Sequence, residues 1–208
     1  MSPAAITSSA PPSSNGKPHP IKSSTKPIIT TSTHETVLPQ TSPSTIPAWV
    51  QPDLTRLLRV EHNPGSFASR AVSLVTLPPH AIFARISSPT PATVAYSSVQ
   101  ASRDLHIELN CDLVYVNHSC DPSVVFDMQR WEVRVGEKGI KEGEELTFFY
   151  PSTEWEMSQP FECLCKSPRC KGLIRGAREM GRKGLEGYWV GRHIEELLDE
   201  GERKEGGA

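Results

Sequence analysis

The sequence lacks several features that would place the protein in a membrane, in a secretory pathway or on nucleic acid. No apolar run among its 208 residues approaches the roughly 18–20 residues that a membrane-spanning helix needs. Its first residues have neither the basic start nor the apolar stretch of a secretory signal. A formal net charge of −2 gives no general attraction to anionic partners, so we expect no strong nucleic-acid binding and no membrane association. We therefore expect an intracellular protein, in the nucleus or the cytoplasm.

Residues 1–48 lack the composition of a folded segment. They consist mainly of Ser, Thr and Pro with few aromatic residues, and cannot bury enough apolar surface to offset the entropy lost on ordering. We predict a disordered tail that is a solvated linker, with a phosphorylated regulatory tail as the alternative. A transit peptide is disfavoured because the segment contains no arginine.

The chain also lacks an even set of cysteines for a disulfide framework. It contains five cysteines, three of which form the pattern C-x-C-x4-C at Cys163, Cys165 and Cys170. In a reducing compartment clustered thiols are typical metal ligands, and a disulfide between the first two would be strained. Zinc binds thiolates tetrahedrally, and structural zinc sites normally have four ligands. The pattern predicts one structural zinc ion, with Cys120 as the best candidate for the fourth ligand and Cys111 as the other cysteine present.

Short apolar stretches separated by turn residues dominate the middle of the chain. They contain the apolar and β-branched residues typical of strands and end near Pro, Gly or Ser, which indicates a mainly β fold. Asp53 is placed to cap a short helix that runs through Leu58. We expect strands over residues 71–77, 81–86, 93–99, 106–116, 123–128, 131–135 and 146–150.

The chain becomes helical in character after Cys170. The stretch 174–184 is basic, and 194–198 carries apolar residues along one side of a short helix. We expect the charged residues 199–205 to form a frayed, solvated end. The basic stretch is interpreted as a solvated helix face, with contact to an acidic partner as the alternative.

A polar segment with the sequence NHSCDP spans residues 117–122. An apolar stretch leads into it, and its proline restricts the exit of the chain. His118 beside Asn117 could bind a polar ligand through side chain and backbone. By itself, however, such a segment is more often a turn with satisfied hydrogen bonds.

Three motifs taken together resemble the SET-domain protein lysine methyltransferases that carry a post-SET zinc module. The segment NHSCDP at 117–122 is followed by GEELTFFY at 143–150 and by the cysteine pattern at 163–170, in the order found in that family. The resemblance covers about residues 71–176. It implies a mainly β, SET-type fold of short strands with a pseudoknot, in which the segment at Asn117 passes beneath a loop of later residues. A zinc-bound post-SET loop and short C-terminal helices complete the expected fold.

Composition and resemblance together divide the chain into four predicted parts. The Ser/Thr/Pro-rich tail at 1–48 precedes a SET-like domain at 49–160. A post-SET zinc module follows at 161–178, and a helical, partly disordered tail occupies 179–208.

The resemblance also implies roles for single residues. Asn117, His118 and Tyr150 match positions that contact the cosubstrate S-adenosyl-L-methionine, and Tyr150 matches the catalytic tyrosine near the transferred methyl group. Phe148 and Phe149 are expected to line the substrate channel. Phe148 matches an aromatic position that helps to set the number of methyl groups, and phenylalanine there would leave room for more than one.

These roles imply methyl transfer from S-adenosylmethionine to a lysine of a protein, such as a histone tail. The lysine amine must be neutral to attack, although its usual pKa is about 10.4. An apolar channel lowers that pKa by desolvation, and a tyrosine hydroxyl with nearby carbonyls orients the amine. In the family, the cysteine matched by Cys120 joins the three post-SET cysteines on zinc, which makes Cys120 the implied fourth ligand.

Departures from the family pattern keep a second function open. The regions 69–71 and 79–81, which match the cofactor loop, contain no glycine. Phe149 stands where an acidic residue usually precedes the catalytic tyrosine, and Val114 stands where a basic residue is common. The alternative is a catalytically weak SET-like module that binds a partner protein and keeps its zinc for stability.

Overall fold

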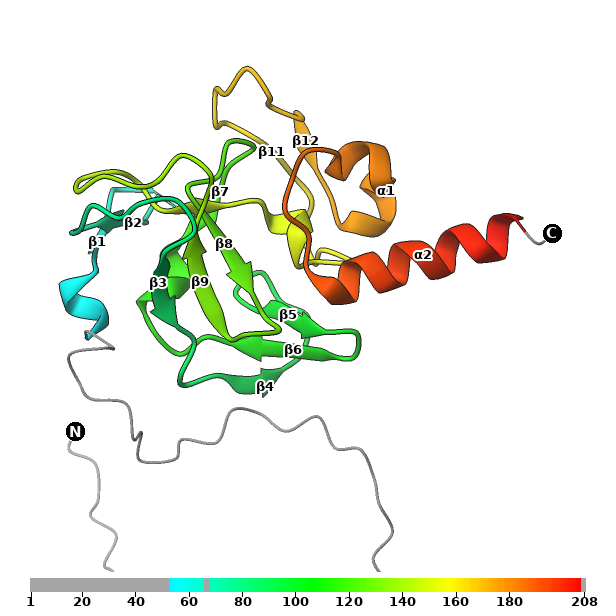
Figure 1. Ribbon diagram of the computed structural model, residues 1–208, viewed down its shortest axis with the longest axis horizontal. Helices are drawn as coiled ribbons and strands as arrows, with labels where there is room; N and C mark the ends of the chain where they lie inside the picture. Colours follow the sequence, from blue (N-terminus) through cyan, green and yellow to red (C-terminus); the bar gives the residue numbers. More distant parts are fainter. Residues whose placement is uncertain (1–52, 66–67, 207–208) are drawn as a thin grey trace, which may run out of the picture. The chain divides into compact units, whose positions relative to one another are not determined.

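The computed structural model describes residues 53–65 and 68–206 (Figure 1). The tail predicted over 1–48 lies outside this part of the chain. Short strands and turns come first, and two α-helices follow at the C-terminal end of the described part. In chain order the elements are the 3₁₀ helix η1 (Leu54–Arg56), β1 (Leu58–Glu61), β2 (Arg70–Ser73), β3 (Ile82–Arg85), β4 (Thr90–Ala92), β5 (Val99–Ser102), β6 (Leu105–Glu108), the 3₁₀ helix η2 (Asp112–Tyr115), β7 (Asn117–His118), β8 (Val124–Asp127), β9 (Glu132–Val135), β10 (Thr147–Phe148), the 3₁₀ helix η3 (Tyr150–Ser152), β11 (Phe161–Glu162), β12 (Leu173–Ile174), α1 (Ala177–Leu185) and α2 (Arg192–Gly206).

The strands form several small sheets rather than one large sheet. In the described part, β1 pairs with β2, β9 lies between β3 and β8, β6 lies between β4 and β5, and β11 pairs with β12, all antiparallel. Strands β7 and β10 pair in parallel. The mainly β fold of short strands that was predicted is therefore confirmed. The predicted short helix after Asp53 is also present, because the Asp53 side chain accepts a hydrogen bond from the backbone N–H of Thr55.

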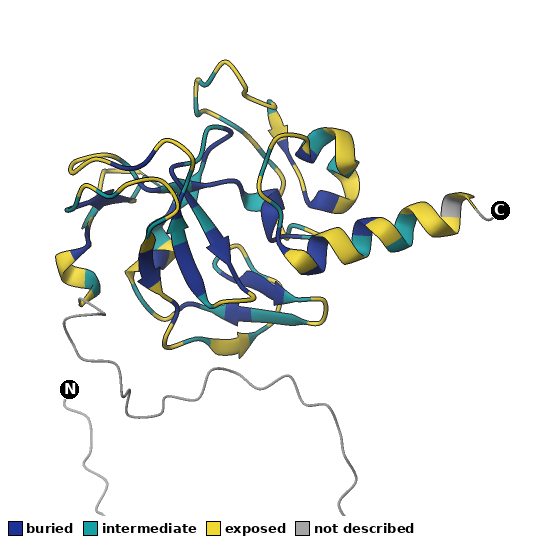
Figure 2. Cartoon of the chain, viewed as in Figure 1, coloured by how far each residue is buried: buried dark blue, intermediate teal, exposed yellow. Residues whose placement is uncertain are grey.

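The larger apolar core collects buried side chains from most of these strands (Figure 2). Phe126 of β8 has no exposed surface, and its ring stacks on that of Phe148 in β10 with centroids 4.2 Å apart. Burying an aromatic side chain of this kind contributes roughly 1.5–3 kcal/mol. The contact therefore fixes β10, which leads directly into Tyr150, on a rigid support.

Strand β9 departs from the half-buried alternation predicted for residues 132–135. Glu132 is only 5% exposed, although it carries a charge. Arg85 and Arg134 lie 3.0 and 2.9 Å from its carboxylate oxygens and compensate that charge. β9 is the central strand of its sheet and has neighbours on both edges. The two arginines therefore balance the charge of Glu132, where the predicted alternation would place solvent.

Four predicted strands are partly wrong. Those over 71–77 and 146–150 end early, with β2 and β10, and two others are interrupted by local side-chain and backbone geometry. Over 93–99 only the last residue belongs to a strand, since the Ser98 hydroxyl accepts a hydrogen bond from the N–H of Ala95 and holds a turn. The strand predicted over 106–116 ends at β6, because Asn110 adopts the left-handed region with φ of 52°. The 3₁₀ helix η2 replaces its second half.

The parallel pairing of β7 with β10 joins two segments about 30 residues apart in the chain. Asn117 lies opposite Thr147, and His118 lies opposite Phe148. Beyond the strands, the N–H of Ser119 donates to the carbonyl of Phe148 at 3.0 Å. The Asn117 segment is thus held against a later strand, as the predicted pseudoknot requires.

A second apolar cluster joins the C-terminal helices to residues of the earlier strands. This cluster therefore unites the cysteine loop, the helices and the end of β10 in one packed unit. Its buried members are Cys120, Phe149, Ile174, Ala177, Leu185, Ile194 and Leu198.

Helix α2 extends well beyond the short helix predicted over 194–198 and includes the charged residues 199–205, predicted to form a frayed, solvated end, most of which are exposed. Arg182 at the end of α1 forms ion pairs with Glu195, Asp199 and Glu202, which follow one another along α2. These contacts hold the charged half of α2 against α1. No helix of the described part is long and apolar enough to cross a membrane.

We predict that replacing Arg182 loosens the C-terminal half of α2. In Arg182→Gln the neutral amide no longer attracts three carboxylates, so backbone amides of residues 199–204 should exchange hydrogen faster in deuterium-exchange mass spectrometry. Because the pairs are exposed, about 1 M salt should reproduce part of the effect in the wild type. Arg192→Gln is the matched control, since Arg192 pairs only with Glu196 on the same helix. Equal protection in the two variants would contradict this role.

Candidate active site

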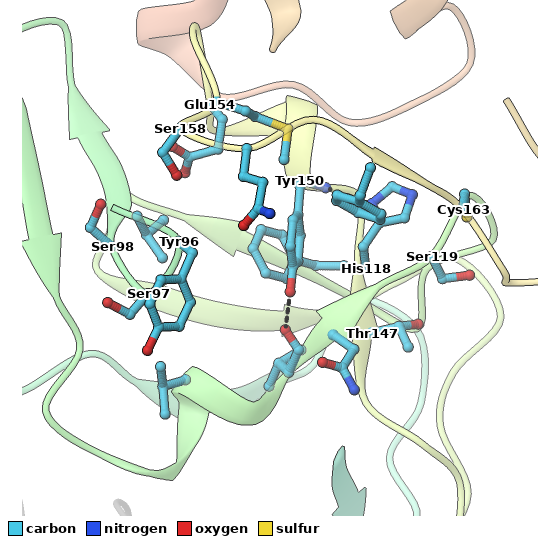
Figure 3. Close-up of a pocket in the computed structure, with 18 of the residues that line it drawn as sticks. Tyr96, Ser97, Ser98, His118, Ser119, Thr147, Tyr150, Glu154, Ser158 and Cys163 are labelled. Atoms are coloured by element: carbon cyan, nitrogen blue, oxygen red, sulfur yellow. Dashed lines mark hydrogen bonds between the residues drawn. The ribbon is translucent and has the colours of Figure 1, made fainter. Parts of the chain in front are cut away.

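A cavity of about 740 Å³ opens between the sheet segments and the cysteine loop (Figure 3). Its wall is built from the segment before β5, from η2 and β7, from β10 with η3, and from β11 with the first two cysteines of the loop. A volume of this size accommodates a ligand of several hundred daltons. The cavity is lined by three carboxylates, Glu145, Glu154 and Glu162, and no Lys or Arg belongs to its described lining.

Tyr150 occupies the centre of this cavity wall. Its hydroxyl donates a hydrogen bond to the carbonyl oxygen of Val116 at 3.4 Å, drawn as a dashed line in Figure 3. Burial, with the nearby charge of Glu154, raises the pKa of Tyr150 to about 12. The phenol therefore keeps its proton at neutral pH and presents a hydroxyl beside a carbonyl on the cavity wall.

His118 connects Tyr150 to the cysteine cluster. The N–H of Tyr150 donates to Nδ1 of His118 at 3.2 Å, and Nε2 lies 3.4 Å from Sγ of Cys120. Burial lowers the pKa of His118 to about 4, so the ring is neutral near pH 7. Because Nδ1 accepts, the single ring proton belongs on Nε2 and points towards the Cys120 sulfur.

Asn117 lies beside His118 and contacts the segment before β2. Its side-chain amide donates to the carbonyl of Ser69 at 2.9 Å and lies 3.5 Å from Oε1 of Glu145. Ser69 belongs to the region expected to supply the cofactor loop. The two predicted cofactor-binding elements are thus adjacent.

Phe148 ends β10 and Phe149 follows it in extended backbone, so their side chains point to opposite sides. Phe148 lines the cavity, and its ring centroid lies 4.6 Å from that of Tyr150. Phe149 does not line the cavity but stacks on Tyr188 at 3.8 Å within the second apolar cluster. Successive side chains of a strand point to opposite faces, which explains the separation. This placement favours a packing role for Phe149 over the predicted channel role.

The four predicted zinc ligands converge at one edge of the cavity. The sulfur atoms of Cys120, Cys163, Cys165 and Cys170 all lie within 4.8 Å of one another, and the first two are 3.9 Å apart. Tetrahedral zinc with Zn–S bonds of about 2.3 Å requires sulfur separations of about 3.8 Å. The donor set and its spacing fit a zinc ion, whereas Cys111 packs against the larger core instead.

The loop between β11 and β12 brings the three clustered cysteines together. The N–H of Cys163 donates to the carbonyl of Gly172, which closes the loop at its base. Lys166 has a φ of 56° and turns the chain after Cys165, and the N–H of Cys170 donates to the carbonyl of Ser167. These two turns fold the third cysteine back towards the first two.

The thiols of the cluster differ in their tendency to ionise. Burial raises the pKa of the Cys120 and Cys163 thiols. Burial opposes ionisation of Cys165 too, yet hydrogen bonds from backbone N–H groups and neighbouring thiols bring its pKa to about 6. Cys165 is therefore the first of these thiols to ionise as the pH rises. Metal binding would release protons from the other thiols.

Tyr188 and Glu154 belong to the site but were not predicted from the sequence. The Tyr188 hydroxyl donates to the carbonyl of Cys120 at 2.8 Å, and the guanidinium of Arg169 lies 4.7 Å from its ring centre. Glu154 follows Tyr150 by four residues. It lines the cavity on the other side of Tyr150 from His118. Neither residue lies in a motif, although the single charged residue of segment 148–155 was a signal for Glu154.

Comparisons with known proteins identify the family. No protein-family model matches the chain. The chain is 48% identical over 155 residues to "Methyltransferase flvH" of Aspergillus flavus, with 74% of this chain and 87% of that protein covered. It is 36% identical over 75 residues to "Histone-lysine N-methyltransferase ash1" of Drosophila melanogaster and 38% identical over 64 residues to "Histone-lysine N-methyltransferase ASHH3" of Arabidopsis thaliana. These matches cover 33% and 27% of this chain, but only 3% and 16% of the two proteins.

A likeness to a solved structure is weaker. A crystal structure of KRYPTONITE in complex with mCHG DNA and SAH matches with a TM-score of 0.41 and 17% identity, over 57% of this chain and 29% of that one. A TM-score of this size is too low to assign a fold. Family membership therefore depends on the sequence relatives.

The structure is a mainly β protein with a cavity that has a cysteine cluster at its edge. Because the chain is 48% identical to the Aspergillus protein over most of both chains and also matches two histone-lysine methyltransferases, it belongs to the SET-domain protein lysine methyltransferase family.

We predict about one zinc ion per chain, bound by the cysteine cluster. Cys120→Ser should lower zinc retention, because a serine hydroxyl does not replace a thiolate and the ion loses its buried ligand. Inductively coupled plasma mass spectrometry of protein purified without chelator measures the zinc content. Cys111→Ser removes a thiol outside the cluster and should retain the wild-type zinc content. Wild-type protein without zinc would refute the metal site.

Proposed function

We propose that this protein transfers a methyl group from S-adenosylmethionine to a lysine side chain of a protein. The observation that carries the proposal is the cavity, in which Asn117, His118 and Tyr150 share one wall lined by carboxylates and by no described Lys or Arg. Both reactants of such a transfer are cations, a sulfonium and an ammonium. A cavity with acidic lining attracts both, whereas a basic lining would repel them.

Tyr150 and Val116 act at the centre of the proposed reaction. The Tyr150 hydroxyl is held by the Val116 carbonyl, so these oxygens form a fixed polar pair in a buried wall. Such preorganised dipoles stabilise the partial positive charge of the methyl group in the transition state and orient the amine. S-adenosylmethionine supplies the methyl group as part of an electron-poor sulfonium.

Asn117 and His118 form the proposed cofactor-binding wall. The Asn117 amide already contacts the carbonyl of Ser69, and His118 is held from both ring nitrogens. Both side chains are thus oriented before a ligand binds, which lowers the entropy cost of binding.

Zinc has a structural role in this proposal. Cys163 and Cys165 also line the cavity, so an ion on the four cysteines would fix the cavity edge against β7. Phe148 lines the part of the cavity next to Tyr150, where it would limit the room around the amine.

The substrate is proposed to be a protein. Two relatives bear the name histone-lysine N-methyltransferase, so core histones are the first substrates to test, and a nuclear or cytoplasmic location fits them. A catalytically weak module that binds a partner is the alternative outcome of the test.

We predict that Tyr150→Phe abolishes methyl transfer without loss of the fold. The variant lacks the hydroxyl that orients the amine and methyl group, and we expect the rate to fall by about 100-fold or more. The measurements are isothermal titration calorimetry with S-adenosylmethionine and transfer of labelled methyl groups to core histones, both with zinc-loaded protein.

Tyr115→Phe is the matched control, because Tyr115 packs against the larger core and does not line the cavity. It should retain wild-type transfer. If the zinc-loaded wild type does not bind the cosubstrate, the enzyme proposal fails and the partner-binding alternative replaces it.

A further inference from the structure

Glu154 is a buried carboxyl in the cavity wall that has no cationic partner among the described residues. Its side chain is only 11% exposed. One oxygen, Oε1, accepts hydrogen bonds from the N–H of Gln100 at 2.9 Å and from the Thr153 hydroxyl at 3.1 Å. No described hydrogen bond ends on the other oxygen, Oε2, which lies 4.0 Å from Nδ1 of His106. A buried carboxylate without a cation is costly, so the position calls for a reason.

The surroundings of Glu154 do not supply the missing positive charge. His106 of β6 is kept neutral because burial lowers its pKa, and its Nδ1 has no hydrogen-bond partner among the described residues. His193 of α2 has a lowered pKa for the same reason and contacts the carbonyl of Thr153 through Nε2. Tyr150, from η3, is neutral. β6, α2 and η3 thus present neutral groups to Glu154, and the charged Arg178 of α1, the helix that packs against η3, pairs with Glu156 instead.

The position of Glu154 relative to Tyr150 indicates which ligand it faces. Figure 3 shows Glu154 on the same side of Tyr150 as Ser98 and Tyr96, and shows His118 and Cys163 on the other side. The hydrogen bond to Gln100 of β5 agrees with this placement. If the cosubstrate lies against Asn117 and His118, the part of the cavity at Glu154 is left for the target lysine.

We propose that Glu154 binds the target lysine's ammonium group through Oε2 and accepts its proton before methyl transfer. The inference rests on the proposed function. An Nζ–H bond breaks and an Oε2–H bond forms, which gives a neutral amine and a carboxylic acid. The amine lone pair then forms the N–C bond while the S–CH3 bond breaks and leaves its electron pair on sulfur. Glu154 returns the proton to solvent after the methylated ammonium departs.

The ionisation of Glu154 suits this role. Burial raises the pKa of Glu154 to about 7, only partly offset by its two hydrogen bonds. The carboxyl is thus ionised and able to accept a proton only above about pH 7, and kcat/KM should rise as the pH increases through that value. The raised pKa means that the folded protein holds a proton that the unfolded chain has already lost. The contribution of Glu154 to the free energy of unfolding therefore falls as the pH rises from the ordinary carboxyl range through about 7.

The decisive variant is Glu154→Gln, which keeps an oxygen for the Gln100 N–H but cannot accept a proton. We expect kcat/KM on core histones to fall by about 100-fold and the rise through pH 7 to vanish. Thermal stability at pH 8 should be no lower than that of the wild type, because no charge is buried. Glu156→Gln is the matched control, since Glu156 is exposed and pairs with Arg178.

A second measurement does not depend on turnover. The full chain with ¹³C-labelled glutamate carboxyls is titrated by NMR with zinc bound, and Glu154 is assigned from its missing signal in Glu154→Gln. Adding n-butylammonium chloride, a mimic of the lysine side chain, should lower the midpoint of Glu154 by about one unit or more relative to potassium chloride.

The two measurements separate the possible failures. A wild type that binds S-adenosylmethionine but methylates no lysine refutes the proposed function, and the amine titration still decides the role of Glu154. A midpoint unaffected by the amine overturns the binding of the ammonium. A Glu154→Gln variant with the wild-type rate and pH profile overturns proton acceptance and leaves Glu154 as a structural link between β5 and η3.

Discussion

Cys120 is the point at which the separate parts of the structure meet. Its sulfur contacts Nε2 of His118, accepts from the N–H of Lys171 and lies within the four-thiol cluster. Its carbonyl accepts the hydroxyl of Tyr188. Since β7 ends two residues earlier, this buried residue links the cofactor-side wall, the cysteine loop and the C-terminal helices. Displacing it would disturb all three together, so the cysteine cluster is part of the site's framework.

The cavity combines a neutral centre with acidic walls. Tyr150 and His118 are kept uncharged by burial, while three carboxylates face the same space. Neutral groups near the reacting atoms allow fixed dipoles to act without competing charges, and the carboxylates provide attraction for cations. This division follows from burial, because Tyr150 is covered by the rings of His118, Phe148 and Phe161, whereas Glu145 and Glu162 are more exposed.

Much of the site could be predicted from residue type and order. Clustered cysteines have few roles in a reducing compartment, and the order of the three motifs placed Asn117, His118 and Tyr150 on one wall. The channel role predicted for Phe149 stays a prediction, because side chains next to each other in extended backbone face opposite ways and Phe149 packs on Tyr188.

Other features were beyond any local pattern. Tyr188 contacts Cys120 across 68 residues of sequence, and Glu154 contacts Gln100 across 54. The extent of α2 likewise depends on Arg182, which lies on another helix. Interactions of this kind form only when distant segments come together in the folded chain. The propensities and periodicity of a short stretch of sequence therefore do not predict them.

The two-residue pairing of β7 with β10 has a consequence for how the protein reaches this structure. So short a parallel ladder adds few hydrogen bonds, yet it closes a loop of about 30 residues. The contact between the sulfur atoms of Cys120 and Cys163 closes a longer loop. Closing such loops costs entropy before the contacts compensate it, which slows folding in proteins dominated by non-local contacts. The cavity therefore depends on non-local contacts, in contrast to the local hairpin of β8 and β9. Because the residues that line the cavity lie between Ala95 and Cys165, a chain still being synthesised lacks a complete cavity until Cys165 has left the ribosome.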